Sequence, residues 1–353
     1  MDSQERVDAA FGRRKPDRTP VFEYCLLSDR ILARALGRPA VELHWDAAVA
    51  ELGWTGAVRQ WARDRLDAAD FFGHDLLYQT PAPPPPDACR PPPEADILED
   101  DPEKRIEAAN RRRASADPTP DSRTLFIYEA LSEEMDRRKN RRPVIAPAYE
   151  HGVWTNTDLM ETMLLAPEIA LEHYRIATLR ALALAAAYRK LGLGLFGVGG
   201  DFSGNRPLIS PEAYRTFILP GLRELVDDIH AGGGRAINAS DGDLWPVIDM
   251  FLIESGVDGY LEIDERAGMD LGRLKRVFGT KVTFLGNIDC GDLLTYGSPE
   301  NIARSVRRCL DDGGESGHIL TASNAIIDSV PLENYWALVN AYREHFRLPP
   351  LTT

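Results

Sequence analysis

Short apolar runs rich in β-forming residues alternate along this chain with longer stretches in which apolar residues recur every three or four positions. Several of the short runs are almost continuously apolar, as is typical of parallel strands buried on both faces of a sheet. Eight such runs predict strands, at residues 19–24, 71–78, 143–148, 194–198, 235–239, 257–262, 281–286 and 318–322.

The intervening stretches predict helices. Two of them open with strong helix-start signals, Ser210-Pro211 and Ser298-Pro299. Eight strands separated by helices predict an α/β protein, a (β/α)8 TIM barrel with an N-terminal helix, formed by residues 1–353 as a single domain. An open doubly wound sheet is the alternative, but no GxGxxG follows the first run. The helices are expected at residues 167–190, 211–231, 244–255, 271–278, 299–311 and 331–346.

Residues 81–142 interrupt this alternation. The stretch 81–94 reads PAPPPPDACRPPPE, and proline can continue neither a helix nor a central strand. The rest of the stretch is highly charged apart from an apolar run at 124–130. We therefore expect an irregular insertion between strands two and three. It could lie over the mouth of the barrel or be a surface insertion without functional weight.

Composition and charge indicate which binding partners and cellular locations are expected for this chain. Of 353 residues, 44% are hydrophobic, and 41 basic against 55 acidic residues give a net charge of −14, which disfavours nucleic acid. We interpret the basic clusters 111–113 and 137–142 as solvated loop faces. No run is long enough to span a membrane, and the N-terminus lacks an apolar signal core. Four scattered cysteines predict no disulfide framework, so we expect a cytoplasmic protein without a membrane or nucleic-acid partner.

Candidate chemistry lies at the predicted carboxyl ends of the strands, where barrel enzymes place their active sites. Carboxylates that converge there could act as acids or bases or bind a polar ligand. Each has a structural alternative: Asp201 could form a turn, and Asn287 and Asp289 could cap the next helix. We expect Asp201, Asp241 and His151 to be catalytic, and the substrate to be bound by Tyr24, Glu150, Asn238, Ser240, Glu262, Asn287, Asp289 and Asn324.

Several segments resemble the uroporphyrinogen decarboxylase (URO-D) superfamily, which includes decarboxylases and the methyltransferases of corrinoid-dependent systems. These are ERVDAAFGRRKPDRTPVF near the N-terminus, LISPEAYRTFILPGLRELVDDIHAGGGRAI, SDGDLWPVIDMFLIESGVDGYLEID, AGMDLGRLKRVFGTKVTFLGNID and the closing DSVPLENYWALVNAYREHF. The resemblance covers roughly residues 4–24 and 143–346. It implies a barrel enzyme that forms a homodimer.

The chain also departs from the patterns of that superfamily. Where uroporphyrinogen decarboxylases have an MRQAGRY-like stretch that binds propionates, this chain has EYCLLSDRIL, in which Arg30 is the only basic residue. The zinc methyltransferases have a His-x-Cys and a later Cys where this chain has Ala239, Asp241 and TASN at 321–324. These departures argue against the haem-pathway reaction and against that zinc site.

Three functions remain open on these grounds. The leading hypothesis is a decarboxylase-type lyase that acts on a small polar or carboxylated substrate, with Asp201 or Asp241 as proton donor. The alternative is the methyltransferase subunit of a corrinoid-dependent system, in which the corrinoid would arrive on a partner protein. The third is a non-catalytic ligand-binding protein. No bound cofactor is expected, although Cys25 and Cys290 with His74 or His151 could build a divalent metal site.

Overall fold

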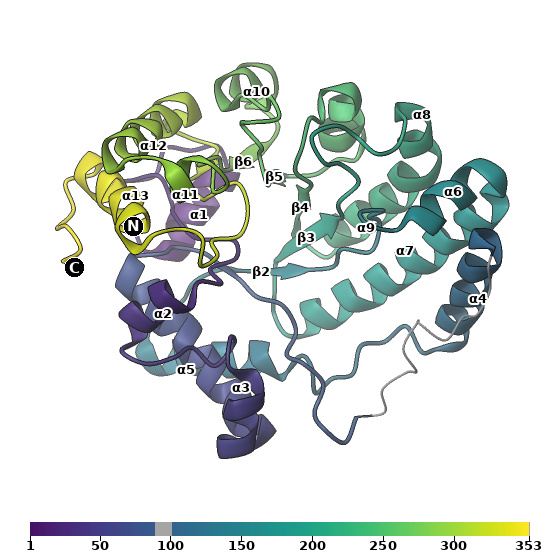
Figure 1. Ribbon diagram of the computed structural model, residues 1–353, viewed down its shortest axis with the longest axis horizontal. Helices are drawn as coiled ribbons and strands as arrows, with labels where there is room; N and C mark the ends of the chain where they lie inside the picture. The colour runs from purple at the N-terminus through teal and green to yellow at the C-terminus, as the bar shows by residue number, and fades with distance from the viewer. Residues whose placement is uncertain (89–100, 353) are drawn as a thin grey trace. The chain divides into compact units, whose positions relative to one another are not determined.

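The computed structural model describes residues 1–88 and 101–352 (Figure 1). Residues 89–100, which belong to the predicted insertion, lie outside the described residues, as does residue 353. The protein is α/β: within the described residues, seven parallel strands are hydrogen-bonded in the order of the chain. They are β1 (Leu77–Tyr78), β2 (Val144–Pro147), β3 (Leu195–Gly199), β4 (Arg235–Ala239), β5 (Gly259–Leu261), β6 (Thr283–Leu285) and β7 (His318–Ile319).

Helices occupy most of the remaining described chain, and none of them is long and apolar enough to cross a membrane. The first five are α1 (Ser3–Phe11), α2 (Asp29–Leu36), α3 (Trp45–Phe72), α4 (Pro102–Ser115) and α5 (Phe126–Arg138). They are followed by α6 (Thr157–Leu165), α7 (Pro167–Lys190), α8 (Pro211–Ala213), α9 (Leu219–Ala231), α10 (Leu271–Phe278), α11 (Leu293–Tyr296), α12 (Pro299–Gly313) and α13 (Leu332–His345). Short π-helical or 3-10 segments lie at Tyr214–Ile218, Trp245–Val247 and Met250–Glu254.

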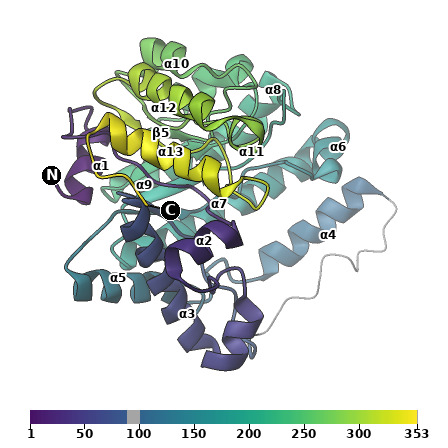
Figure 2. The same cartoon turned by 60° about the vertical axis from the view of Figure 1, so that its left-hand side comes forward.

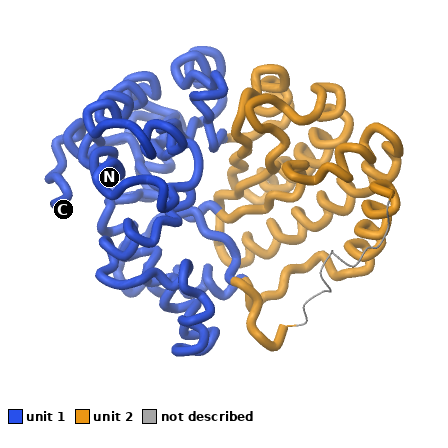
Figure 3. Tube along the Cα trace, viewed as in Figure 1, with its two compact units in different colours: residues 1–82, 125–145, 259–353 blue, residues 83–124, 146–258 orange. Residues whose placement is uncertain are grey.

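Contacts within the chain divide it into two compact units (Figure 3). Unit 1 comprises residues 1–82, 125–145 and 259–353, and unit 2 comprises residues 83–124 and 146–258. Each unit is therefore built from discontinuous stretches of sequence, and each is described here by itself.

Unit 1 holds strands from both ends of the chain. β5 pairs with β6 and β6 with β7, all in parallel, and β1 pairs with β2. Residues 20–22 join the two groups, because Val21 forms a parallel bridge with Leu320 and its carbonyl accepts the N–H of Asp75. Around these strands α12 packs along α13, and the two helices lie side by side in both views (Figures 1 and 2).

Two strand predictions in unit 1 need correction. The strand expected at 19–24 is reduced to isolated bridges at Val21 and Leu26. Its Pro20 has no N–H to give to a ladder, and only the Pro20 carbonyl bonds Leu320. The strand expected at 71–78 begins late, because α3 continues through Phe72 and ends at Gly73, a left-handed cap. In place of the expected eight strands, the described residues therefore form seven strands, with isolated bridges in place of the first.

Unit 2 contains the best-formed pair of strands. β3 and β4 are in parallel register over five residues, from Leu195 opposite Arg235 to Gly199 opposite Ala239. The inner residues of both strands, such as Phe196 and Ile237, are completely buried. α7 packs on α9, and α4 and α6 pack on each other and on α7. The insertion therefore contributes a regular helix, α4, to this unit.

Candidate active site

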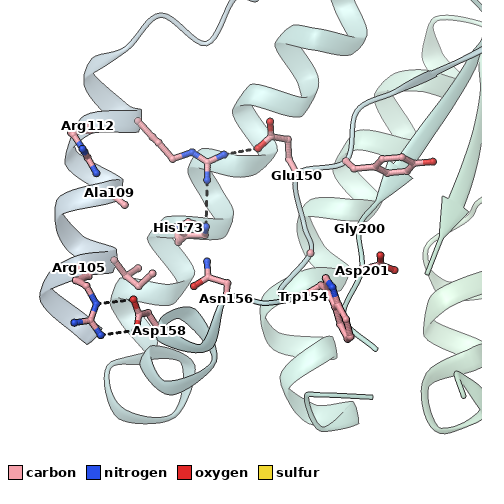
Figure 4. A pocket seen from close by; sticks show the side chains of 14 residues that line it. Arg105, Ala109, Arg112, Glu150, Trp154, Asn156, Asp158, His173, Gly200 and Asp201 are labelled. Atoms are coloured by element: carbon pink, nitrogen blue, oxygen red, sulfur yellow. Dashed lines mark hydrogen bonds and ion pairs between the residues drawn. The ribbon is translucent and has the colours of Figure 1, made fainter. Parts of the chain in front are cut away.

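A cavity of about 470 Å³ opens in unit 2 at the carboxyl ends of β2 and β3. Parallel α/β proteins bind ligands at this edge, because the loops that leave the strands there present their side chains. Arg105, Ala109 and Arg112 lie along one side of the cavity on α4, and Trp154 and Asp201 lie on the other side (Figure 4). The remaining lining residues are Ile106, Arg113, Tyr149, Glu150, Gly152, Asn156, Asp158, His173 and Gly200.

Glycines let the loops after β2 and β3 pack closely enough to hold Asp201. Gly200 has a φ of 142°, and a Cβ there would come within 2.7 Å of the Gly152 nitrogen. A Cβ on Gly152 would in turn meet the Asp201 backbone at 2.8 Å. The Asp201 carbonyl accepts the N–H groups of Val153 (2.7 Å) and Trp154 (2.9 Å). Local glycine content therefore fixes the backbone from which the Asp201 side chain projects.

The Asp201 carboxyl is only partly satisfied. The Ser240 hydroxyl and the Asp241 backbone N–H donate to it, and both come from the loop after β4. Its Oδ1 is buried and has no hydrogen-bond partner. Burial raises the pKa of Asp201 above the ordinary value for aspartate, and the two hydrogen bonds offset only part of this effect. The shift is toward the neutral acid, the direction that suits a group that gives a proton to a substrate.

Four other charged side chains of the cavity form two ion pairs. Arg105 holds Asp158 through two hydrogen bonds of 2.7 Å, which lower the pKa of Asp158. Arg113 donates to Glu150 at 2.5 Å. The indole of Trp154 is 52% exposed and offers an apolar surface beside them. The cavity thus combines an apolar face, paired charges and a carboxyl whose pKa is raised by burial.

The structure brings Asp201, Ser240 and Asp241 together in unit 2, as the strand-end argument expects for each. His151 lies next to the cavity but is completely buried, and its Nε2 is 3.1 Å from the Thr178 hydroxyl. Burial lowers the pKa of His151 to about 4, so its ring is neutral at pH 7. Asn238 is also buried and donates to the Phe251 carbonyl. Both side chains therefore support the site rather than reach its surface.

Most of the expected site residues in unit 1 form local hydrogen bonds or are packed within that unit. Asp289 accepts the N–H groups of Gly291 and of Leu293, the first residue of α11, which agrees with its structural alternative. Asn324 accepts the N–H of the following residue, and Asn287 is buried. Glu262 is buried with a φ of 71°, and Tyr24 packs edge-on against Tyr78 with ring centroids 4.5 Å apart.

Metal-binding side chains do not cluster in the part of the chain that the structure describes: no three His, Cys, Asp or Glu side chains there could hold one ion. Burial raises the pKa of Cys25 to about 12 and also raises that of Cys290, which disfavours the thiolates that bind metals. By the resemblance described above, Ala239 and Asp241 stand where zinc methyltransferases have an imidazole and a thiol donor, respectively. The residues present do not fit that zinc site.

The arginines of α4 and His173 were missed as site residues. The interpretation of 111–113 as a solvated loop face is wrong for Arg112 and Arg113, which lie on a helix and line the cavity. The available signal was helical spacing: Arg105, Ala109 and Arg112 recur at intervals of four and three, which places them on one face.

Comparison with known proteins defines the family. Residues 155–345 match the family model for uroporphyrinogen decarboxylase (URO-D). This match covers more than half of the chain, and the chain belongs to this family. The resemblance seen in the sequence is thereby confirmed.

The relatives include both chemistries of the family. The chain is 30% identical over 144 residues to the methylated-thiol–coenzyme M methyltransferase of Methanosarcina mazei, covering 41% of this chain and 36% of that protein. It is 28% identical over 189 residues to the uroporphyrinogen decarboxylase of Xylella fastidiosa, covering 50% of each. The chain thus spans about a third to a half of these curated relatives.

A solved structure described as a methyltransferase from Methanosarcina mazei has the same fold. It superimposes with a TM-score of 0.68 and 16% identity, over 98% of this chain and 99% of that one. At this identity the likeness supports the architecture, a TIM-barrel-like URO-D fold.

Proposed function

We propose that this protein is a methyltransferase that transfers a methyl group from a small substrate in the unit 2 cavity to a corrinoid carried by a separate protein. The observation that carries the proposal is the Asp201 carboxyl on the cavity wall, whose Oδ1 is buried without a hydrogen-bond partner and whose pKa is raised. The choice of methyl transfer rests on the methyltransferase of Methanosarcina mazei among the relatives.

Methyl transfer requires a proton donor for the leaving group, and Asp201 can supply the proton. When the bond between a heteroatom and its methyl group breaks, the electron pair of that bond stays on the heteroatom. Asp201 gives this atom its proton, which makes the leaving group neutral. The corrinoid serves as the acceptor of the methyl group. Ser240 and the Asp241 N–H then stabilise the Asp201 carboxylate that remains.

Decarboxylation is the second candidate, because several relatives are uroporphyrinogen decarboxylases. In this reaction a C–C bond breaks, CO2 leaves, and the electron pair left on carbon takes the proton of Asp201. The same residue therefore serves both reactions, and the product separates them.

The test is to incubate the purified protein anaerobically with reduced free cobalamin and a panel of small methyl ethers, thioethers and methylamines, some of them carboxylated. Methyl transfer is followed by the visible spectrum of the corrinoid, and CO2 release is measured in parallel. We expect methylation of cobalamin by at least one donor and its loss in Asp201→Asn. Release of CO2 without methyl transfer would overturn the proposal in favour of the decarboxylase, and binding without any turnover would overturn both.

A further inference from the structure

Helix α4 presents one continuous face to the cavity in unit 2. Arg105, Ile106, Ala109, Arg112 and Arg113 all line the cavity, and their spacing of three and four residues places them on the same side of the helix. Asp101 caps the start of α4 by accepting the N–H of Glu103. The insertion therefore supplies the cavity with a wall that carries three guanidinium groups.

Two of these three positive charges are neutralised inside the cavity. Arg105 pairs with Asp158 through both of its carboxylate oxygens, and Arg113 pairs with Glu150. The closest approach of Arg180 to Glu150 is 4.0 Å, so the main partner of Glu150 is Arg113. Neither pair leaves a full charge for a ligand.

Arg113 is also held from its other side. Asn110 donates to the Ile169 carbonyl through Nδ2, which leaves its Oδ1 to accept the Nδ1–H of His173 at 2.8 Å. His173 then presents the lone pair of Nε2 to Arg113 at 3.5 Å. Burial and the neighbouring guanidinium lower the pKa of His173 to about 4, so this lone pair is available at pH 7. The position of Arg113 is thereby fixed by the protein itself.

Arg112 differs from both of its neighbours in the cavity. Its Nη2 atom is buried and has no hydrogen-bond partner, and no carboxylate among the described residues forms an ion pair with it. A guanidinium keeps its charge in proteins, and a buried N–H donor without a partner is unfavourable. Adjacent Arg111 shows the ordinary surface arrangement, since it is 65% exposed and pairs with Glu107.

We infer that Arg112 is a substrate-binding residue and that the cavity takes a small carboxylate, held by the guanidinium of Arg112, with its reacting group directed toward Asp201. A carboxylate matches the planar pair of N–H donors of a guanidinium and supplies the missing charge. The cavity of about 470 Å³ suits a small organic acid. This inference rests on the proposed function, because it names the substrate class of the same site.

The test uses two probes of the same shape, benzoate and its uncharged amide benzamide, with binding measured by isothermal titration calorimetry. We expect benzoate to bind more tightly than benzamide, and Arg112→Gln to weaken benzoate by about 10- to 100-fold, the range for a hydrogen bond to a charged group. Binding of benzamide should be unchanged. Arg112→Lys keeps the charge and loses the planar pair of donors, so it should fall between wild type and Arg112→Gln.

Arg111→Gln is the matched control, because it removes an arginine one position away that is exposed and paired. It should leave benzoate binding at the wild-type level. Equal weakening by both glutamine variants would contradict the inference, since it would indicate a general effect of charge. Failure of the wild-type protein to bind benzoate, or undiminished binding by Arg112→Gln, would also overturn it.

The inference and the proposed function fail in different ways. Benzoate binding that depends on Arg112, in a protein that methylates no cobalamin, would leave the carboxylate site standing and remove the methyltransferase. Methyl transfer from a carboxylated donor at equal rates in wild type and Arg112→Gln would support the methyltransferase and contradict the carboxylate site.

Discussion

Two aspartates, one in each unit, have opposite surroundings. Asp75 in unit 1 is fully buried, and both of its oxygens are saturated by donors. Asp201 in unit 2 keeps a buried oxygen without a partner, beside a cavity. The donors to Asp75 are Ser3, Arg6, Arg18 and the backbone N–H of Val21.

The difference separates a residue that serves folding from one that serves chemistry. A saturated carboxylate ties α1 and residues 18–21 to the start of β1, and no capacity remains for a ligand. An unsatisfied carboxyl costs stability, and proteins retain such groups where function needs them. Two arginines show the same difference between a paired and an unpaired group. Arg18 forms an ion pair with Asp75, whereas Arg112 has a buried nitrogen without a hydrogen-bond partner.

Replacement of Asp201 by Asn gives the largest expected effect on activity. The amide cannot supply the proton, and we expect turnover to fall by 10²- to 10⁴-fold. Because burial raises the pKa of Asp201 and its protonated form is the active one, wild-type activity should decline as pH rises through that pKa. Turnover measured against pH checks both effects. A variant that keeps full turnover would remove Asp201 from the mechanism.

Replacement of Asp75 by Asn should lower the stability of the fold rather than the activity. It leaves Arg6 and Arg18 without their buried counter-charge, and we expect the free energy of unfolding to fall by about 3–5 kcal/mol. Urea denaturation measures this loss. Asp17→Asn is the control, since Asp17 also pairs with Arg6 but is 43% exposed, and it should cost at most about 1 kcal/mol. Equal losses would show that burial of the pair is irrelevant.

Glu23 in unit 1 offers a pH-dependent test of a buried carboxyl. Burial raises its pKa from 4.5 to about 7, although Ala322 and Thr321 donate to it. Between these values the unfolded chain loses the proton first, so ionisation of Glu23 lowers the free energy of unfolding as pH rises from 4.5 to 7. Glu23→Gln should remove this slope, which amounts to about 3 kcal/mol at most.

Denaturant unfolding at pH 4.5 and pH 8 measures the Glu23 effect. The gain of the variant over wild type should appear at the higher pH. Glu315→Gln, at a side chain that is 76% exposed, is the control and should show no such gain. A difference between Glu23→Gln and wild type that stays constant with pH would contradict the shift.

The Arg105–Asp158 pair should have the smallest effect. Both side chains are about one-third exposed, so Arg105→Gln should cost at most about 1 kcal/mol of stability. Because Arg105 is already neutralised, we expect benzoate binding to change much less than in Arg112→Gln. Calorimetry on the two variants compares them directly. If Arg105→Gln weakened benzoate binding more than Arg112→Gln, the carboxylate would be bound by Arg105, and the assignment to Arg112 would be wrong.

Strongly patterned elements were predictable from the sequence. The strand at 235–239 and the helices at 167–190 and 271–278 have the bounds of β4, α7 and α10. The first two strands, expected at 19–24 and 71–78, were not predictable, because strand length there depends on tertiary pairing. Pro20 limits the first strand. Phe72 packs against Tyr335 and Trp336, and α3 therefore extends into the second.

The candidate site was predictable only where it follows the strands. Asp201 and Glu150 come directly after apolar runs, so the rule that active sites lie at strand ends finds them. Arg112 lies in a charged insertion whose position is set by contacts of α4 with α6 and α7, and local sequence does not encode those contacts. The strand-end rule also selects His151, but its side chain is buried. This burial depends on tertiary contacts, so the local sequence could not predict it.

The most direct measurement is the free energy of unfolding of Asp201→Asn, set beside that of Asp75→Asn, by urea denaturation at pH 8. If Asp201 is kept for chemistry, its variant should be at least as stable as wild type, because the carboxyl that it replaces is only partly satisfied, while Asp75→Asn loses several kcal/mol. A loss in Asp201→Asn as large as that in Asp75→Asn would identify Asp201 as a structural residue and contradict the account.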